Sequence, residues 1–211
     1  GPIARRLPPS VNALLPSVLL RGSESAPSIR AIADRLDALC GASVGSLVRK
    51  KGEIQLTGLF ADGLEDRYAG EPVFSRLLEL TVELLPRPRT QGGVFVPQIV
   101  MQERQKLLDT IESTLDDKAE YCQTQLLRQM CRGEAYAVGR LGEAGPLAAV
   151  DEAALWAHYQ KVLASSRAEL FYLGSKPAQE VAALLRPLLK DLPRGACVPV
   201  STAPGPQPKA L

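Results

Sequence analysis

The sequence is poor in the residues that carry most metal-site and catalytic chemistry. It has a single histidine, His158, and only four cysteines among 211 residues, and no two cysteines form a C-x-x-C pair. A zinc site built from histidine and cysteine therefore lacks ligands, and any nucleophilic triad would have to use His158. Because His158 lies within an apolar stretch with helical spacing, we interpret it as a partly buried helix residue.

Charge of one sign and long apolar runs are missing as well. The 25 basic and 23 acidic residues give a formal net charge of +2, so no broad positive surface is available for a nucleic-acid backbone. No stretch approaches the roughly 18 apolar residues of a membrane span, and no secretory signal opens the chain. Dispersed thiols are typical of a reducing compartment. We therefore expect a cytoplasmic protein that binds neither nucleic acid nor membrane.

The length suits one large domain, and the composition predicts its limits. Residues 1–11 open with Gly1-Pro2, which resembles the remnant of a cleaved tag, so we expect the natural chain to begin upstream. Residues 12–195 form the predicted domain. Residues 196–211 are rich in proline and glycine, which predicts a linker toward a further domain.

Hydrophobic periodicity predicts an α+β fold, a mostly antiparallel sheet with helices packed on one face. Alternating residues at 44–49 and 53–61 predict an antiparallel hairpin, and residues 168–173 predict a later strand. Helical spacing, capping residues and prolines predict the other elements. Helices are expected between a Ser25 cap and Gly41, over 72–85, from Pro97, over 119–130, from an Asp151 cap to Leu163, and over 177–189.

Three charged clusters are interpreted first as solvated surface. Arg49-Lys50-Lys51 is expected in an exposed hairpin turn, with a contact to an acidic partner as the alternative. Residues 103–106 are expected on the exposed face of the long helix. Asp116-Asp117 is interpreted as a break in that helix with local charge pairing.

Three stretches, in this order, resemble the insulinase/pitrilysin family of zinc peptidases, the inverzincins. The first is Leu-Leu-Pro-Ser-Val-Leu-Leu-Arg-Gly-Ser at 14–23, followed by Leu-Cys-Gly-Ala at 39–42. The second is the long helix from Gln102, and the third spans 136–174 and is similar to the family's loop, helix and closing strand. The chain most resembles zinc-less bacterial members labelled elongation-factor-P-modification-associated peptidase-like proteins.

The resemblance implies a peptidase site in which each functional residue is replaced. When the chain is aligned on its Arg-Gly-Ser turn, the two histidines and the glutamate of H-x-x-E-H fall on Ala13, Ser17 and Pro16, and the third zinc ligand falls at about Thr110. Alanine has no donor atom, hydroxyl groups are poor zinc ligands, and proline cannot act as a general base. Glu103 is retained as the family's supporting carboxylate. We therefore expect no catalytic residue, metal or cofactor in this chain.

In this family, two or four such domains close into a chamber around a peptide, and zinc-less members commonly pair with a zinc-bearing one. The resemblance thus implies a non-catalytic domain that forms a peptide-binding chamber with a zinc-bearing paralogous subunit and takes a peptide or unfolded polypeptide. The alternatives are a purely structural subunit derived from the same fold and an active metallopeptidase with unrecognised ligands. The candidate peptide contacts lie in the hairpin, at Val44, Ser46, Arg49, Ile54 and Leu56.

The resemblance also implies that some strands of the family's sheet are absent from this sequence. The family places strands before the motif helix, whereas only about eleven residues precede it here. Either those strands were removed or the edge is completed differently, and an uncovered edge would be adhesive.

Replacing Ser17 with histidine tests the assignment of the degenerate site. We expect Ser17→His to restore no peptidase activity, because one imidazole leaves the zinc ligand set short. The measurements are elemental analysis of the purified protein and peptide hydrolysis by the variant with added zinc. One tightly held zinc per unsubstituted chain, or metal-dependent cleavage by the variant, would contradict the assignment.

Overall fold

The computed structural model describes residues 8–114, 116–190, 192–193 and 195–196; residues 1–7 and most of the predicted linker at 196–211 lie outside them. The helices are α1 (Pro9–Leu19), α2 (Ile29–Asp37), α3 (Asp66–Ala69), α4 (Val73–Glu83), α5 (Pro97–Ser113), α6 (Lys118–Met130), α7 (Ala144–Ala148), α8 (Glu152–Ser165) and α9 (Ala178–Leu189), with a 3₁₀ turn η1 (Ala135–Ala137). The strands are β1 (Ser43–Lys51), β2 (Ile54–Asp62), β3 (Thr90–Gln91) and β4 (Val94–Phe95). None of these helices is both long and apolar enough to cross a membrane.

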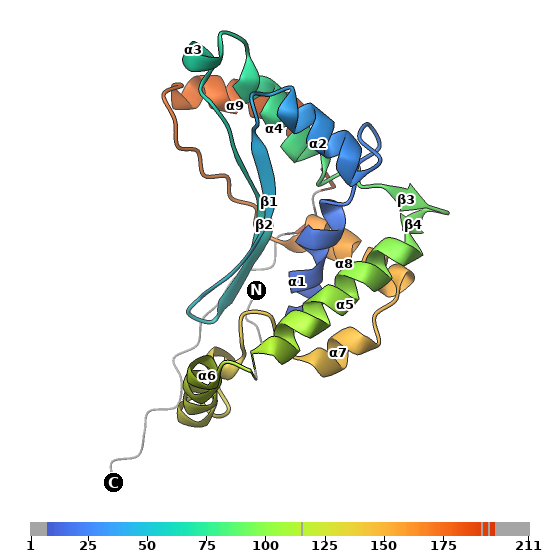
Figure 1. Cartoon of the computed structure of the whole chain (residues 1–211), viewed down its shortest axis with the longest axis vertical. Coiled ribbons are helices and arrows are strands. Elements are labelled where there is room, and N and C mark those ends of the chain that lie inside the picture. The colour runs from blue at the N-terminus through green and yellow to red at the C-terminus, as the bar shows by residue number, and fades with distance from the viewer. Residues whose placement is uncertain (1–7, 115, 191, 194, 197–211) are drawn as a thin grey trace.

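The fold is α+β, as the periodicity predicts, and it contains two groups of helices. Helices α2, α4 and α9 form one group, and α1, α5, α7 and α8 form the other, and the β1–β2 hairpin runs along one side of both groups, from α2 and α4 toward α6 (Figure 1). Helix α6 stands apart, beside the tip of the hairpin (Figure 1). Each group has its own buried apolar residues, and the hairpin contacts both α1 and α4.

The predicted hairpin is confirmed. Strands β1 and β2 pair antiparallel without interruption, from Ser43 opposite Asp62 to Lys51 opposite Ile54. The two-residue turn between them begins at Gly52, whose φ of +59° lies in the left-handed region that glycine adopts without strain. Both outer edges of this pair lack a strand partner among the described residues.

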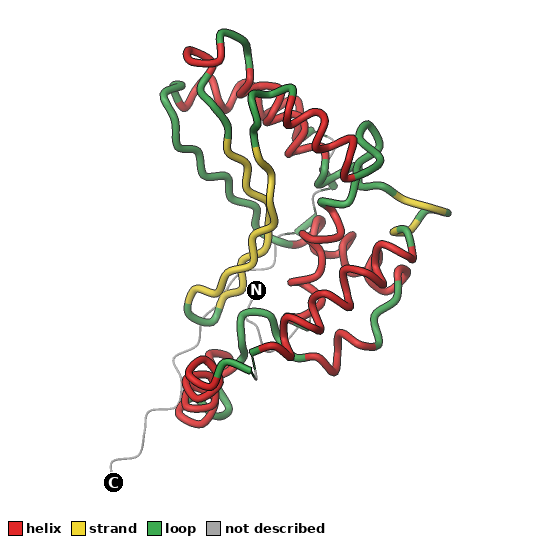
Figure 2. Tube along the Cα trace, viewed as in Figure 1, coloured by secondary structure: helices red, strands yellow, loops and turns green. Residues whose placement is uncertain are grey.

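The strand predicted at residues 168–173 is wrong. The backbone there is a drawn-out loop that links α8 to α9 (Figure 2). A strand is defined by main-chain hydrogen bonds to a neighbouring strand, and the described part of the chain places none beside this segment. Residues 168–173 alternate in hydrophobicity as a strand does, but no neighbouring strand among the described residues pairs with them.

Helix α1 is buried on nearly all sides and forms the centre of its helix group. Leu14 is fully buried, and α1 packs against α5, α7, α8 and the hairpin. Pro16 lies inside this helix, where a proline removes a main-chain hydrogen bond and costs about 3 kcal/mol. The apolar residues that α1 buries offset that cost, and they pack against a common set of partners. These partners are Phe95, Val100, Leu147, Val150, Leu155 and Tyr159.

The cap of α2 differs from the predicted one. Ser28, not Ser25, precedes the helix, and its hydroxyl oxygen accepts a hydrogen bond from the backbone N–H of Ala31 at 3.1 Å. Ser25 instead donates its backbone N–H and its hydroxyl to the carboxylate of Glu83 on α4. The predicted capping residue, Ser25, is therefore bound to Glu83, which is 58 residues away in the sequence.

Aspartates cap the two later helices. Asp117 accepts hydrogen bonds from the backbone N–H groups of Ala119 and Glu120, which confirms the break between α5 and α6 and gives it a cause in capping. Asp151 caps α8 through the backbone N–H of Ala154 at 2.7 Å, as predicted.

A chain of polar side chains joins α8, α1 and the hairpin. His158 Nε2 lies 2.7 Å from Asn12 Oδ1, and Asn12 Nδ2 donates to Gln55 Oε1 at 3.1 Å. Gln55 Nε2 in turn donates to the carbonyl oxygens of Pro9 and Arg140, both at 2.8 Å. His158 is only 8% exposed. The histidine therefore connects three elements inside the fold, in agreement with its interpretation as a buried helix residue.

Burial makes the protonation of His158 unfavourable in the folded state. Desolvation, with a smaller contribution from the charge of Lys161, lowers the pKa of His158 from 6.5 to about 4. Between these two values the unfolded chain binds more protons than the folded chain, so the free energy of unfolding falls as the pH drops. The full stabilisation is present above pH 6.5.

Replacing His158 with glutamine tests this pH dependence. Gln can keep the hydrogen bond to Asn12 but does not titrate, so between pH 7 and pH 5 we expect the unfolding free energy of the unsubstituted protein to fall by about 2 kcal/mol more than that of His158→Gln. Urea denaturation at both pH values measures the difference. Equal losses in the two proteins would show that His158 is not the titrating group.

Candidate functional site

The positions aligned with the peptidase motif lie on α1 and α5, which pack together. Ala13 and Pro16 are buried, Ser17 is half-buried and Thr110 is exposed. The hydroxyl of Thr110 donates to the carbonyl oxygen of Lys106 at 2.7 Å, within its own helix. The structure thus brings the two helices of the motif together, but the donor atoms at these positions do not fit zinc. In the part of the chain that the structure describes, no cluster of His, Cys, Asp and Glu side chains could hold a metal ion.

Glu103 is buried, which corrects the prediction that residues 103–106 form an exposed face. Its carboxylate lies 3.2 Å from Arg21 Nη1 and 2.9 Å from Lys106 Nζ. Arg21 also donates to Gln102 Oε1 at 2.7 Å. The turn after α1 is therefore held against α5 by two charge-assisted contacts. The carboxylate that the resemblance aligns with the family's supporting carboxylate therefore has a structural role in this chain.

The five candidate peptide contacts are divided between two faces of the hairpin. Directly paired residues share a face, and the register places Arg49 opposite Leu56, with Ile54 on the same side. Val44 and Ser46 lie on the other face, where Val44 packs against the cores under α2 and α4. We call these the outer and the inner face. Only Arg49, Ile54 and Leu56 are on the side that faces away from the helices.

The outer face carries an aromatic residue that the sequence analysis did not select. Phe60 is 48% exposed and Leu56 is 41% exposed. The ring of Phe60 covers Gly45 on the paired strand so closely that a Cβ atom at Gly45 would lie 2.4 Å from it. Alternation through Leu56, Gly58 and Phe60 was the available signal. The outer face therefore presents an apolar strip beside the guanidinium of Arg49.

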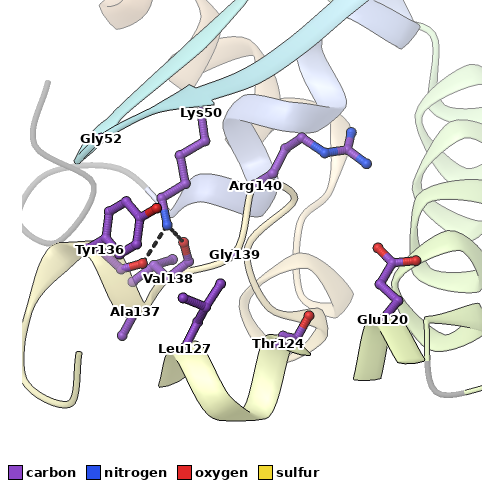
Figure 3. A pocket seen from close by; sticks show the side chains of 10 residues that line it. All are labelled: Lys50, Gly52, Glu120, Thr124, Leu127, Tyr136, Ala137, Val138, Gly139 and Arg140. Atoms are coloured by element: carbon purple, nitrogen blue, oxygen red, sulfur yellow. Dashed lines mark hydrogen bonds between the residues drawn. The ribbon is translucent and has the colours of Figure 1, made fainter. Parts of the chain in front are cut away.

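Lys50 fixes the tip of the hairpin to the loop after α6. Its ammonium group donates to the carbonyl oxygens of Tyr136 and Val138 and lies 4.2 Å from the ring centroid of Tyr136 (Figure 3). Burial lowers the pKa of Lys50 from its usual value. Arg49 and Lys51 are exposed, so the predicted solvated cluster is right for those two residues and wrong for Lys50.

A cavity of about 280 Å³ lies beside this contact, between the hairpin tip and α6. Arg140 and Glu120 line it on the side away from Lys50 and Tyr136, and Thr124 and Leu127 line it from α6 (Figure 3). Its one carboxylate partly balances its two cations, and Lys50 is already bonded to carbonyl oxygens. The cavity therefore provides little positive field for an anionic ligand.

A comparison with known proteins finds one relative of similar sequence. No protein-family model matches the chain. A protein of Bacillus subtilis (strain 168) named probable inactive metalloprotease YmfF is 31% identical over 171 residues, which cover 80% of this chain and 40% of the relative. The chain thus spans about two fifths of the length of that curated relative.

Solved structures show the same fold. A conserved protein from Enterococcus faecalis V583 superposes with a TM-score of 0.81 at 28% identity, over 89% of this chain and 44% of that one. A peptidase M16 inactive domain from Pseudomonas fluorescens superposes with a TM-score of 0.74 at 18% identity, over 100% of this chain and 47% of that one. The packed motif helices, the hairpin and these likenesses agree. The chain resembles zinc-less members of the insulinase-like peptidases and has the fold of peptidase M16 inactive domains, without the H-x-x-E-H motif in its sequence.

Proposed function

We propose that this chain is a non-catalytic, peptidase-like domain that forms one wall of a peptide-binding chamber, which a zinc-bearing paralogous subunit completes. One observation carries the proposal: among the described residues, the outer edges of the β1–β2 hairpin have no strand partner, and Leu56 and Phe60 on its outer face are exposed. The ligand would be an extended peptide or unfolded polypeptide.

The absence of catalysis in this domain is supported by chemistry and by likeness. Ala13, Pro16, Ser17 and Thr110 supply neither a zinc ligand set nor a general base. The Bacillus subtilis relative is named probable inactive, and the Pseudomonas fluorescens structure is described as an inactive domain. Arg21 and Glu103 form an ion pair between the turn after α1 and helix α5, so the packing of these two helices does not depend on a metal site.

Peptide binding at the hairpin follows from its free edges. An extended peptide added to a strand edge gains main-chain hydrogen bonds that accept many sequences, while side chains on the outer face select among them. On that face Leu56 and Phe60 offer apolar contact, and Arg49 offers a positive charge. The hairpin therefore favours peptides that carry both acidic and apolar residues at every second position, so that both kinds of side chain lie on the outer face. Lys50 holds the tip in place, which reduces the ordering cost of binding.

A purely structural subunit is the second candidate. The exposed Leu56 and Phe60 would then be covered by a neighbouring subunit rather than by a peptide. This candidate differs from the first in one measurable respect, because it requires no affinity for free peptides. A cytoplasmic location remains a prediction. The described cysteines Cys40, Cys122 and Cys131 are free thiols, which is compatible with a reducing compartment.

A peptide-binding measurement tests the proposal. The probe is a fluorescein-labelled ten-residue peptide that carries Glu and Val in turn at every second position, with Thr at the positions between them. It is titrated with the 211-residue chain and followed by fluorescence anisotropy. We expect Arg49→Ser to weaken binding about threefold to tenfold and to flatten its salt dependence, because an exposed ion pair contributes roughly 1 kcal/mol and is screened by salt.

Ser46→Ala is the matched control on the inner face of the same strand, and its affinity should equal that of the unsubstituted chain. Amide hydrogen exchange locates the peptide, with protection expected in β1 or β2. No binding at millimolar peptide would favour the structural subunit. Protection confined to the helices would also contradict the proposal.

A further inference from the structure

The loop after η1 presents three carbonyl oxygens to the tip of the hairpin. Lys50 Nζ donates to the carbonyl oxygens of Tyr136 and Val138, the second at 2.8 Å. Gln55 Nε2 donates to the carbonyl oxygen of Arg140, also at 2.8 Å. The three acceptors are alternate residues of the loop, and the two donors are directly opposite each other in the register of β1 and β2. We call the two donor side chains and these three carbonyl groups the clasp.

The clasp lies on the inner face of the hairpin. Because paired residues share a face, Lys50 and Gln55 lie on the same side as Val44, whereas Arg49 and Leu56 lie on the outer face. The clasp therefore holds the two strands from the side opposite to the proposed peptide contacts, and it does not cover the side chains of the outer face.

Apolar packing fixes the open end of the hairpin but not its tip. Among the described residues, Val44 and Leu59 are the hairpin residues that join the apolar clusters, and both lie toward the end where Ser43 pairs with Asp62. A two-stranded hairpin is at best marginally stable in water by itself. The tip is therefore held by polar contacts, which are the clasp and the hydrogen bonds of Gln55 with α1.

The Gln55 end of the clasp is connected to buried side chains. Gln55 Oε1 accepts a hydrogen bond from Asn12 Nδ2 at 3.1 Å, and Asn12 Oδ1 lies 2.7 Å from His158 Nε2. Since the oxygen of Asn12 can only accept, His158 donates through Nε2, and the donors of this network all point toward the loop. The Lys50 end has no such support and lies beside the cavity at the hairpin tip. Lys50 is therefore the end of the clasp that can be released.

Helix α6 depends on the Lys50 end of the clasp. None of the thirteen residues of α6 is buried, and the described element that it contacts most is η1. Tyr136 of η1 supplies one of the carbonyl oxygens that Lys50 binds, and its ring centroid lies 4.2 Å from the ammonium nitrogen (Figure 3). The contacts of Lys50 therefore connect α6 to the hairpin tip.

We propose that the clasp is a conformational device in which Lys50 couples helix α6 to the hairpin tip, so that its release loosens both and lowers the affinity of the hairpin for an extended peptide. The effect on affinity rests on the proposed function. Its physical reason is preorganisation, because a strand edge that is already fixed loses less conformational freedom when a peptide pairs with it. Lys50 is thus a positioning residue, since its ammonium group is bound to the loop and not to the peptide.

Amide hydrogen exchange of the free chain tests the coupling. Lys50→Met keeps an unbranched side chain but removes the ammonium group. We expect it to speed exchange about tenfold in residues 49–56 and in α6, and to leave the open end of the hairpin unchanged, because a hydrogen bond from a charged donor contributes about that much to local stability. Lys50→Arg should keep most of the protection, since a guanidinium group also donates to carbonyl oxygens. Lys51→Met, at the exposed neighbouring residue, is the matched control and should change nothing.

Peptide titration tests the effect on affinity, with the fluorescein-labelled peptide of Glu, Val and Thr described above as the probe. Lys50→Met should weaken binding about threefold to tenfold and keep the salt dependence of the unsubstituted chain, whereas Arg49→Ser flattens it. Circular dichroism checks that the variants are folded.

The two measurements separate the possible failures. Unchanged exchange in Lys50→Met, or faster exchange at the tip without α6, would overturn the coupling. Faster exchange in both segments with unchanged peptide affinity would overturn the effect of the clasp on binding. If the unsubstituted chain binds no peptide, the proposed function fails together with that effect, and the exchange measurement still decides whether Lys50 couples α6 to the hairpin.

Discussion

The burial of helix α1 is the constraint on which the rest of this structure depends. Its residues contact α5, α7, α8 and the hairpin, so the helix has almost no exposed side. Asn12 on this helix satisfies its amide by joining His158 on α8 to Gln55 on β2, whereas the buried hydroxyl of Ser10 has no hydrogen-bond partner within the described residues. The placement of both the degenerate motif and the hairpin follows from how α1 is packed.

The motif region shows how a peptidase fold persists without peptidase chemistry. In an active zinc site, the side chains at these helix positions would coordinate the metal and would not be buried in the apolar core. Here Ala13 and Pro16 contribute to the core instead, and even the retained carboxylate, Glu103, is used to pair with Arg21. The interactions that hold the two helices together are therefore separable from those that would bind a metal.

The remaining functional potential lies in unpaired β structure. The hairpin combines strand edges that are unpaired within the described part of the chain with exposed apolar side chains on its outer face. Such edges promote aggregation of a monomer but can bind a partner strand in an assembly. The added strand pairs with the main-chain groups and covers the apolar side chains at the same time. Exposed charges beside the hairpin edge, at Arg49 and Lys51, lessen the hazard.

Local sequence determined the features that depend on neighbouring residues. The hairpin turn at Gly52, the Asp151 cap and the α+β class could all be predicted, since turns, caps and periodicity act within a few residues. The alignment of Ala13, Pro16, Ser17 and Thr110 with the zinc motif rests on the resemblance and stays a prediction. Tertiary structure alone decided the burial of Glu103 and the capture of Ser25 by Glu83. It also decided that residues 168–173 form no strand, because ion pairs, hydrogen bonds and strand pairing depend on partners distant in sequence.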